Sequence, residues 1–113
     1  MTNQITRAEL RDAIAAGSVT VVEALPAAYY EDAHLPGAIN IPHTEVRKLA
    51  PELLPAKDAA IVVYCANEPC PNSGIAAHVL GKLGYTDVRD YAEGKQGWRD
   101  AGLPLEHGVP VAG

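Results

Sequence analysis

The sequence predicts a doubly wound parallel α/β sheet with helices on both faces, built as a single domain. Short runs rich in β-branched residues, such as 18–24 and 60–64, alternate with segments whose apolar residues recur at helical spacing, such as 7–16 and 73–83. A chain of 113 residues is long enough to bury one core, and it contains no internal repeat that would indicate a second domain. Strands joined by helices in this way favour a parallel sheet.

The first third of the chain is expected to form a helix, a strand and a second, short helix. Thr6 and Glu9 have the spacing of a capping box at the start of a helix. Gly17 suits the left-handed end of the same helix. The run 18–24 is mostly apolar, as in a strand covered on both faces. Pro26 then suits the start of a short helix.

The middle of the chain is punctuated by prolines. Pro36 and Gly37 predict a turn, and a short strand is expected over 38–41. A helix is expected over 43–49, after which Pro51 and Pro55 should break regular structure.

The second half is expected to contain the central strand of the sheet, followed by a helix that Asn72 or Ser73 caps. The residues of this helix that are expected to be buried are Ile75, Ala76, Val79, Leu80 and Leu83. The expected elements are a strand over 60–64, a helix ending at Gly84, a strand over 88–91, a short helix over 93–102 and an extended, partly loose tail over 103–113. We place the domain at residues 1–106 and a C-terminal tail at 107–113.

Composition narrows the class of protein. The net charge is −5 and no basic stripe is present, which argues against nucleic acid or an anionic membrane surface as partner. The longest apolar run, 59–66, is too short to span a membrane, and no secretory signal is visible at the N-terminus. We therefore expect a cytoplasmic protein whose two cysteines are reduced and functional.

Both cysteines lie in one loop between the central strand and the next helix. Cys65 directly follows the strand, and Cys70 comes five positions later. A thiol at a strand end, just before a helix N-terminus, can be stabilised as a thiolate by the helix dipole and by convergent backbone N–H groups. Ligand sites in such sheets gather beyond the carboxyl ends of the strands.

Three segments in this order resemble the rhodanese-like domain family. The segment 34–42 (HLPGAINIP) looks like the first signature of that family, and 61–65 (IVVYC) is similar to the strand that leads to its catalytic cysteine. The segments 83–98 and 101–104 resemble its C-terminal signature. The resemblance covers nearly the whole chain and implies a single-domain sulfurtransferase of the thiosulfate type.

In this family the cysteine carries sulfane sulfur as a persulfide, and the resemblance assigns that role to Cys65. It implies a thiosulfate-like donor, an acceptor that is a thiol, cyanide or a protein, and no cofactor. The alternative for Cys65 is an inert, buried cysteine at a strand end. The expected active-site loop consists of Ala66, Asn67, Glu68, Pro69, Cys70, Pro71, Asn72 and Ser73.

The sequence departs from the family pattern near the site. The loop lacks the arginine that is common in the family, and Cys70 stands about where it would be. Glu23 and Leu25 occupy positions where the family often has Asp and Arg. Lys95 is the candidate for a compensating, anion-binding cation, with an ordinary exposed lysine as the alternative. These departures leave the fold intact but bear on substrate choice.

Cys70 has two interpretations. It either fills space in the loop or acts as a resolving thiol that attacks a Cys65 persulfide, releases sulfide and leaves a disulfide. A separation of five residues allows this approach without forcing it. The histidines show no metal-ligand spacing with the cysteines, so no metal site is expected.

Three functions fit the loop. A sulfurtransferase is favoured, and a non-catalytic or redox-sensing module using Cys65 and Cys70 is the main alternative. A cysteine phosphatase or arsenate reductase is disfavoured, because no arginine lies between Cys65 and Ser73 to hold an oxyanion.

Overall fold

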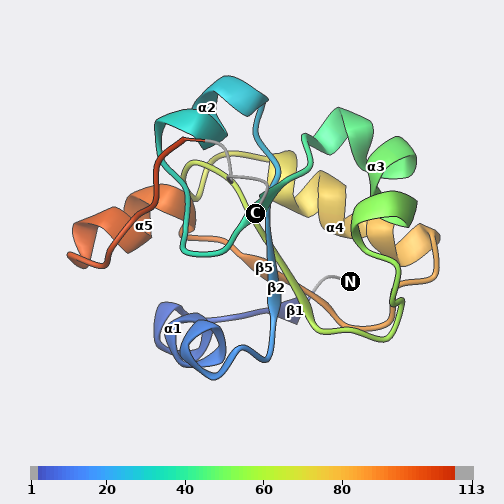
Figure 1. Ribbon diagram of the computed structural model, residues 1–113, viewed down its shortest axis with the longest axis horizontal. Helices are drawn as coiled ribbons and strands as arrows, with labels where there is room; N and C mark the ends of the chain where they lie inside the picture. Colours follow the sequence, from blue (N-terminus) through green and yellow to red (C-terminus); the bar gives the residue numbers. More distant parts are fainter. Residues whose placement is uncertain (1–2, 109–113) are drawn as a thin grey trace.

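The computed structural model describes residues 3–108 and contains a five-stranded sheet whose strand order is β1-β5-β4-β2-β3 (Figure 1). Each neighbouring pair of strands is parallel. The strands are β1 (Asn3–Gln4), β2 (Thr20–Glu23), β3 (Ile39–Asn40), β4 (Ile61–Tyr64) and β5 (Val88–Tyr91). The predicted parallel sheet is confirmed, and its central strand is the one that precedes Cys65.

Helices cover both faces of the sheet, with α1 and α5 on one side and α3 and α4 on the other (Figure 1). The helices are α1 (Arg7–Ala16), α2 (Ala27–Asp32), the 3-10 helix η1 (His43–Glu45), α3 (Val46–Leu53), α4 (Asn72–Lys82) and α5 (Gly94–Asp100). This arrangement confirms the predicted doubly wound fold.

Successive side chains of the central strands point to opposite faces of the sheet and form two separate cores. Val21 and Val62 pack with Leu10 and Trp98 on the α1/α5 face. The neighbouring residues on these strands, Val22 and Val63, belong to the core under α3 and α4. All four residues of β4 are buried, as expected for a strand covered on both sides.

The predicted ends of α1 are confirmed. The Thr6 hydroxyl accepts from the Glu9 N–H at 3.2 Å, and the Glu9 carboxylate accepts from the Thr6 N–H at 3.0 Å. Gly17 ends the helix with φ of +66°, a conformation that costs glycine little.

The prediction that Pro51 breaks regular structure is wrong, because Pro51 lies inside α3. Proline removes one backbone hydrogen bond there, but Val46 and Ala50 still bury the inner face of the helix. The last turn is closed by the Leu54 N–H, which donates to the Ala50 carbonyl at 2.7 Å. The Tyr85 hydroxyl donates to that same carbonyl at 3.1 Å.

The start of α4 also differs from the prediction. Pro71 occupies the N-cap position, and Asn72 and Ser73 are the first helical residues rather than caps. The buried face consists of Ser73, Ala76, Ala77 and Leu80. Ile75 faces away from this stripe and is 44% exposed, so its predicted burial is wrong.

Two features at the ends of the chain were not predicted. Strand β1 pairs with β5 at the sheet edge, although two polar residues carry no strand pattern. Residues 103–108 are held in place rather than loose: His34 and Glu106 exchange two backbone hydrogen bonds of 2.8 Å, and the Trp98 indole donates to the Pro104 carbonyl at 2.8 Å. The rest of the predicted tail, 109–113, lies outside the described residues.

Within residues 3–108, the structure has no helix that is both long enough and apolar enough to cross a membrane.

Candidate active site

Cys65 lies at the carboxyl end of β4, in the middle of the sheet, and is 1% exposed. Its backbone is fixed by the N-terminus of α5. The Lys95 N–H donates to the Cys65 carbonyl at 2.9 Å, and the Gln96 N–H donates to the Ala66 carbonyl at 2.8 Å. Two otherwise unpaired N–H groups of a helix start thereby hold the first residues of the loop.

Gly94 makes this close approach possible. Its φ is +66°, and a Cβ atom built there would lie 2.6 Å from the Cys65 carbonyl oxygen. Any side chain at this position would push α5 away from the loop. Gly94 lies within the segment that resembles the C-terminal family signature, and its place just after the last strand is the sequence signal for this role.

Cys65 and Cys70 form a disulfide, with their Cα atoms 6.2 Å apart, inside the usual range for such bridges. The expectation that both cysteines are reduced therefore differs from the structure. The local reason is a tight turn in which the Cys70 N–H donates to the Asn67 carbonyl at 3.1 Å and brings Cys70 back towards the strand end.

The loop is buried at its first residue and open along its rim. Asn67, Glu68 and Pro69 are exposed, while Cys70 is only partly buried. Within residues 3–108, the N–H groups of Ala66, Asn67 and Glu68 make no hydrogen bond to a backbone carbonyl. These donors remain available to a negatively charged group held in the loop.

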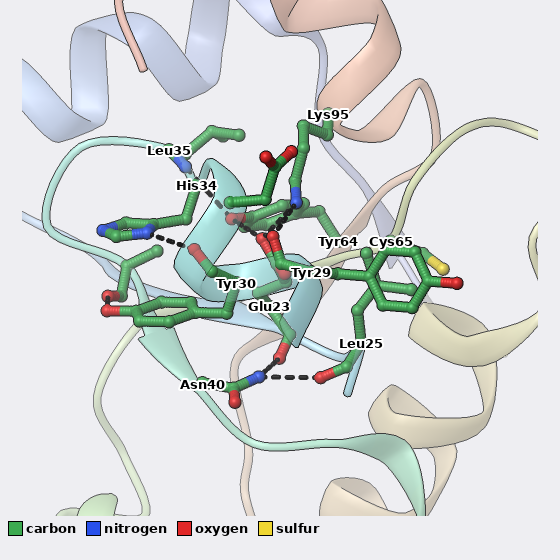
Figure 2. Close-up of polar contacts among 12 residues, drawn as sticks. Glu23, Leu25, Tyr29, Tyr30, His34, Leu35, Asn40, Tyr64, Cys65 and Lys95 are labelled. Carbon is green, nitrogen blue, oxygen red and sulfur yellow. Dashed lines mark hydrogen bonds and ion pairs between the residues drawn. The ribbon is translucent and has the colours of Figure 1, made fainter. Parts of the chain in front are cut away.

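A cluster of buried polar groups lies beneath the site (Figure 2). The Glu23 side chain is 0% exposed, and its Oε1 atom accepts from the Tyr64 hydroxyl at 2.7 Å. The same oxygen lies 3.1 Å from the Lys95 Nζ atom. The Lys95 ammonium also donates to the Tyr29 carbonyl at 2.9 Å. The Tyr64 hydroxyl accepts from the Leu35 N–H at 3.1 Å.

This cluster is strongly desolvated. Burial raises the pKa of Glu23, and the hydrogen bond from Tyr64 and the charge of Lys95 only partly oppose that rise. Burial also raises the pKa of Tyr64, and the neighbouring Glu23 charge adds to the rise. Among the described residues, the Glu23 Oε2 atom is buried without a hydrogen-bond partner. Lys95 and Tyr64 are therefore the groups that stabilise the ionised form of Glu23.

Lys95 is neither an exposed lysine nor a cation directed at the loop. Its side chain is 9% exposed and its ammonium is paired with Glu23. Lys95 is the second residue of α5, whose N-terminus packs on the loop, so its side chain extends into the interior. Anion binding by Lys95 stays a prediction, and it would require the ammonium to leave Glu23.

The remaining candidate residues lie around this centre. Ser73 is buried at the start of α4, and its hydroxyl faces Asp90, whose pKa is raised by burial. The His34 Nδ1 atom lies 2.8 Å from the Tyr30 carbonyl oxygen, a contact that ties the turn to α2. Among residues 3–108, no group of three His, Cys, Asp or Glu side chains is arranged to hold a metal ion.

A surface pocket of about 290 Å³ opens between the loop and α5. Its lining includes Asn67, Glu68 and Pro69 from the loop and Glu93 and Gln96 from the other side. Glu93 is paired with Arg7 at 2.9 Å, so its charge is partly neutralised. A small reactant approaching the loop from this side would meet the exposed rim before the buried sulfur of Cys65.

Comparison with known proteins gives a consistent result. Residues 6–101 match the family model for the rhodanese-like domain. The chain is 35% identical over 79 residues to the thiosulfate sulfurtransferase PspE of Escherichia coli, covering 70% of each. It is 40% identical over 107 residues to the HTH-type transcriptional regulator Rv0324 of Mycobacterium tuberculosis, covering 95% of this chain and 46% of the regulator. The chain thus spans about half the length of that relative.

Solved structures with a similar fold are also found. The BH2092 protein of Bacillus halodurans superposes with a TM-score of 0.86 at 27% identity, covering 94% of this chain and 77% of the other. A thiosulfate sulfurtransferase from Pseudomonas aeruginosa gives a TM-score of 0.85 at 27% identity, covering 96% of this chain and 21% of the other.

Proposed function

We propose that this chain, which belongs to the rhodanese-like domain family, is a sulfurtransferase that carries sulfane sulfur as a persulfide on Cys65. The observation that carries the proposal is the position of Cys65 at the carboxyl end of the central strand, with its carbonyl fixed by α5. A nucleophile held on rigid elements keeps its geometry through the reaction.

The reaction starts from the reduced loop. The Cys65 thiolate attacks the outer sulfur of a thiosulfate-like donor, the sulfur–sulfur bond of the donor breaks, and sulfite leaves with the bonding electron pair. The acceptor, which is a thiol, cyanide or a protein thiol, then attacks the outer sulfur of the persulfide. The Cys65 thiolate leaves and the cycle is complete.

The loop supports the charged states of this reaction. The N–H groups of Ala66, Asn67 and Glu68, which make no hydrogen bond to a backbone carbonyl within residues 3–108, can donate to the negative persulfide. Pro69 and Pro71 offer no N–H group, so the cradle depends on the first half of the loop and on the helix start. The negative charge of Glu68 repels multiply charged anions, including the thiosulfate dianion, and so favours sulfur donors of lower charge.

The test is thiocyanate production from thiosulfate and cyanide by the reduced protein. The reduced wild type should form thiocyanate and gain the mass of one sulfur atom with thiosulfate alone. Cys65→Ser should do neither, whereas Cys70→Ser keeps the carrier thiol and should still accept sulfur. Absence of both products with several sulfane donors would overturn the proposal.

A second candidate is a redox-sensing module without turnover, and the Cys65–Cys70 disulfide is the observation that favours it. A relative that is named as a transcriptional regulator is compatible with such a role. Measuring the pKa of the Cys65 thiol in the Cys70→Ser protein separates the two. A pKa well below that of an ordinary thiol supports sulfur transfer, and an unperturbed one supports the sensing module.

A further inference from the structure

We propose that the loop also reduces its own cargo: Cys70 converts the sulfane sulfur on Cys65 into sulfide, and an external dithiol then reopens the resulting disulfide by attacking Cys70. This inference rests on the proposed persulfide chemistry at Cys65. It assigns a sulfide-releasing activity to a chain whose family resemblance implies only sulfur transfer.

The step balances in atoms and electrons. The Cys70 thiolate attacks the Sγ atom of the Cys65 persulfide, a bond forms between the two Sγ atoms, and the bond to the outer sulfur breaks. The outer sulfur leaves with the electron pair as hydrosulfide. The sulfane sulfur is thereby reduced by two electrons, and the two cysteine thiols are oxidised to the disulfide that the structure contains.

The structure places the two sulfurs for this step. The turn closed by the Cys70 N–H and the Asn67 carbonyl returns Cys70 to the strand end, where the two Cα atoms lie 6.2 Å apart. This separation permits a bond between the sulfurs without movement of the sheet. Because the disulfide occupies the same Sγ atom as the persulfide, a chain in this form cannot accept sulfur.

In the disulfide form, burial determines which of the two sulfurs a reductant can reach. Cys65 is 1% exposed and its carbonyl is fixed by α5, whereas Cys70 is partly exposed between the exposed Pro69 and Pro71. Attack on a disulfide requires access along the bond to the attacked sulfur. A reductant must therefore bond to Cys70 first, and Cys65 leaves as the thiolate, ready to accept the next sulfur.

The nature of the reductant follows from this order. A monothiol that attacks Cys70 remains bound there as a mixed disulfide until a second thiol arrives. A dithiol removes itself with its second sulfur, becomes an intramolecular disulfide and returns Cys70 as a thiol. The two electrons that sulfide carries away are thereby restored by a dithiol of low reduction potential.

The deciding experiment is one round of reaction without any acceptor. Reduced, desalted wild type, Cys70→Ser, Cys70→Ala and Cys65→Ser are each mixed anaerobically with one equivalent of thiosulfate, and sulfite, sulfide and intact mass are measured. Wild type should release one sulfite and one sulfide per chain and lose two hydrogen atoms. Both Cys70 variants should release sulfite only and keep one added sulfur atom. Cys65→Ser should release neither.

The outcomes separate this inference from the proposed function. If wild type keeps a stable persulfide and releases no sulfide, the inference is overturned while sulfur transfer stands. If no variant with Cys65 releases sulfite, the proposed function fails and the inference fails with it. The two Cys70 variants guard against a folding defect peculiar to one substitution.

A second experiment tests which sulfur of the disulfide the reductant attacks. Oxidised wild type is treated with glutathione, quenched with acid and analysed by tandem mass spectrometry across residues 65–70. The glutathione adduct should lie on Cys70, and dithiothreitol should yield both thiols with no adduct. An adduct found mainly on Cys65 would overturn the assignment of Cys70 as the sulfur that the reductant attacks.

Discussion

Replacing Lys95 by methionine should destabilise the protein by about 3 kcal/mol at neutral pH. Removal of one partner of a buried ion pair leaves an uncompensated charge, which typically costs about 3–5 kcal/mol. The pair is buried on both sides, with 9% exposure for the Lys95 side chain and 0% for Glu23. The Tyr64 hydroxyl still donates to Glu23 in the variant, so we take the lower end of this range.

The loss should depend on pH in a defined direction. Burial already raises the pKa of Glu23, and removing the ammonium raises it further. A carboxyl whose pKa is higher in the folded than in the unfolded state stabilises the fold at low pH and loses that stabilisation as pH rises through the folded-state pKa. Lys95→Met should therefore lie closer to wild type at pH about 5 than at pH about 7.

Urea unfolding measures the effect. With a slope of about 2 kcal/mol per molar urea, a loss of about 3 kcal/mol lowers the midpoint by about 1.5 M. The double variant Glu23→Gln/Lys95→Met removes both charges and should recover most of this loss. Lys48→Met, at an exposed position of α3, is the matched control and should stay within about 0.5 kcal/mol of wild type. A loss below about 1 kcal/mol for Lys95→Met, with no recovery in the double variant, would refute the reasoning.

Three further changes test other parts of the structure. Gly94→Ala should lower the stability of the fold by at least about 1–2 kcal/mol, because alanine is strained in the left-handed conformation. It should also slow sulfite release from thiosulfate, because the added Cβ displaces the Cys65 carbonyl. Unchanged release would contradict the role of α5. Burial raises the pKa of Asp90, so wild type should lose stability as pH rises through that pKa; Asp90→Asn should flatten this fall in thermal unfolding between about pH 4 and 7. Tyr85→Phe deprives the Ala50 and Leu54 carbonyls at the end of α3 of a donor and should cost about 1 kcal/mol in urea unfolding; equal midpoints would show that water replaces the hydroxyl.

The parts of the fold that sequence reasoning predicted are those determined by local patterns. The capping box at Thr6, the stop at Gly17 and the apolar run that became β4 each need only neighbouring residues. The errors came from tertiary context. Packing keeps α3 helical through Pro51. The inner face of α4 contains Ala76 and Leu80, as predicted, but Ser73 and Ala77 complete it in place of Ile75.

The site shows the same division. The position of Cys65 follows from the strand that precedes it, but the pairing of Glu23 with Lys95 joins residues far apart in the chain. In the sequence, Glu23 is a departure from the family pattern and Lys95 is a candidate cation, and no sequence rule connects the two. The spacing of Cys65 and Cys70 allowed a disulfide, while the turn at Asn67 that brings them together became visible only in three dimensions.

The central position of β4 separates the motions of the site from those of the fold. Strand β4 is hydrogen-bonded to β2 on one side and β5 on the other, so its amides should exchange with solvent only when the whole domain unfolds. The N–H groups of the loop rim lack such partners among the described residues and should exchange within local openings. Cys70 can therefore pass between thiol and disulfide many times during the lifetime of one folded molecule, while the strand that leads to Cys65 remains in place.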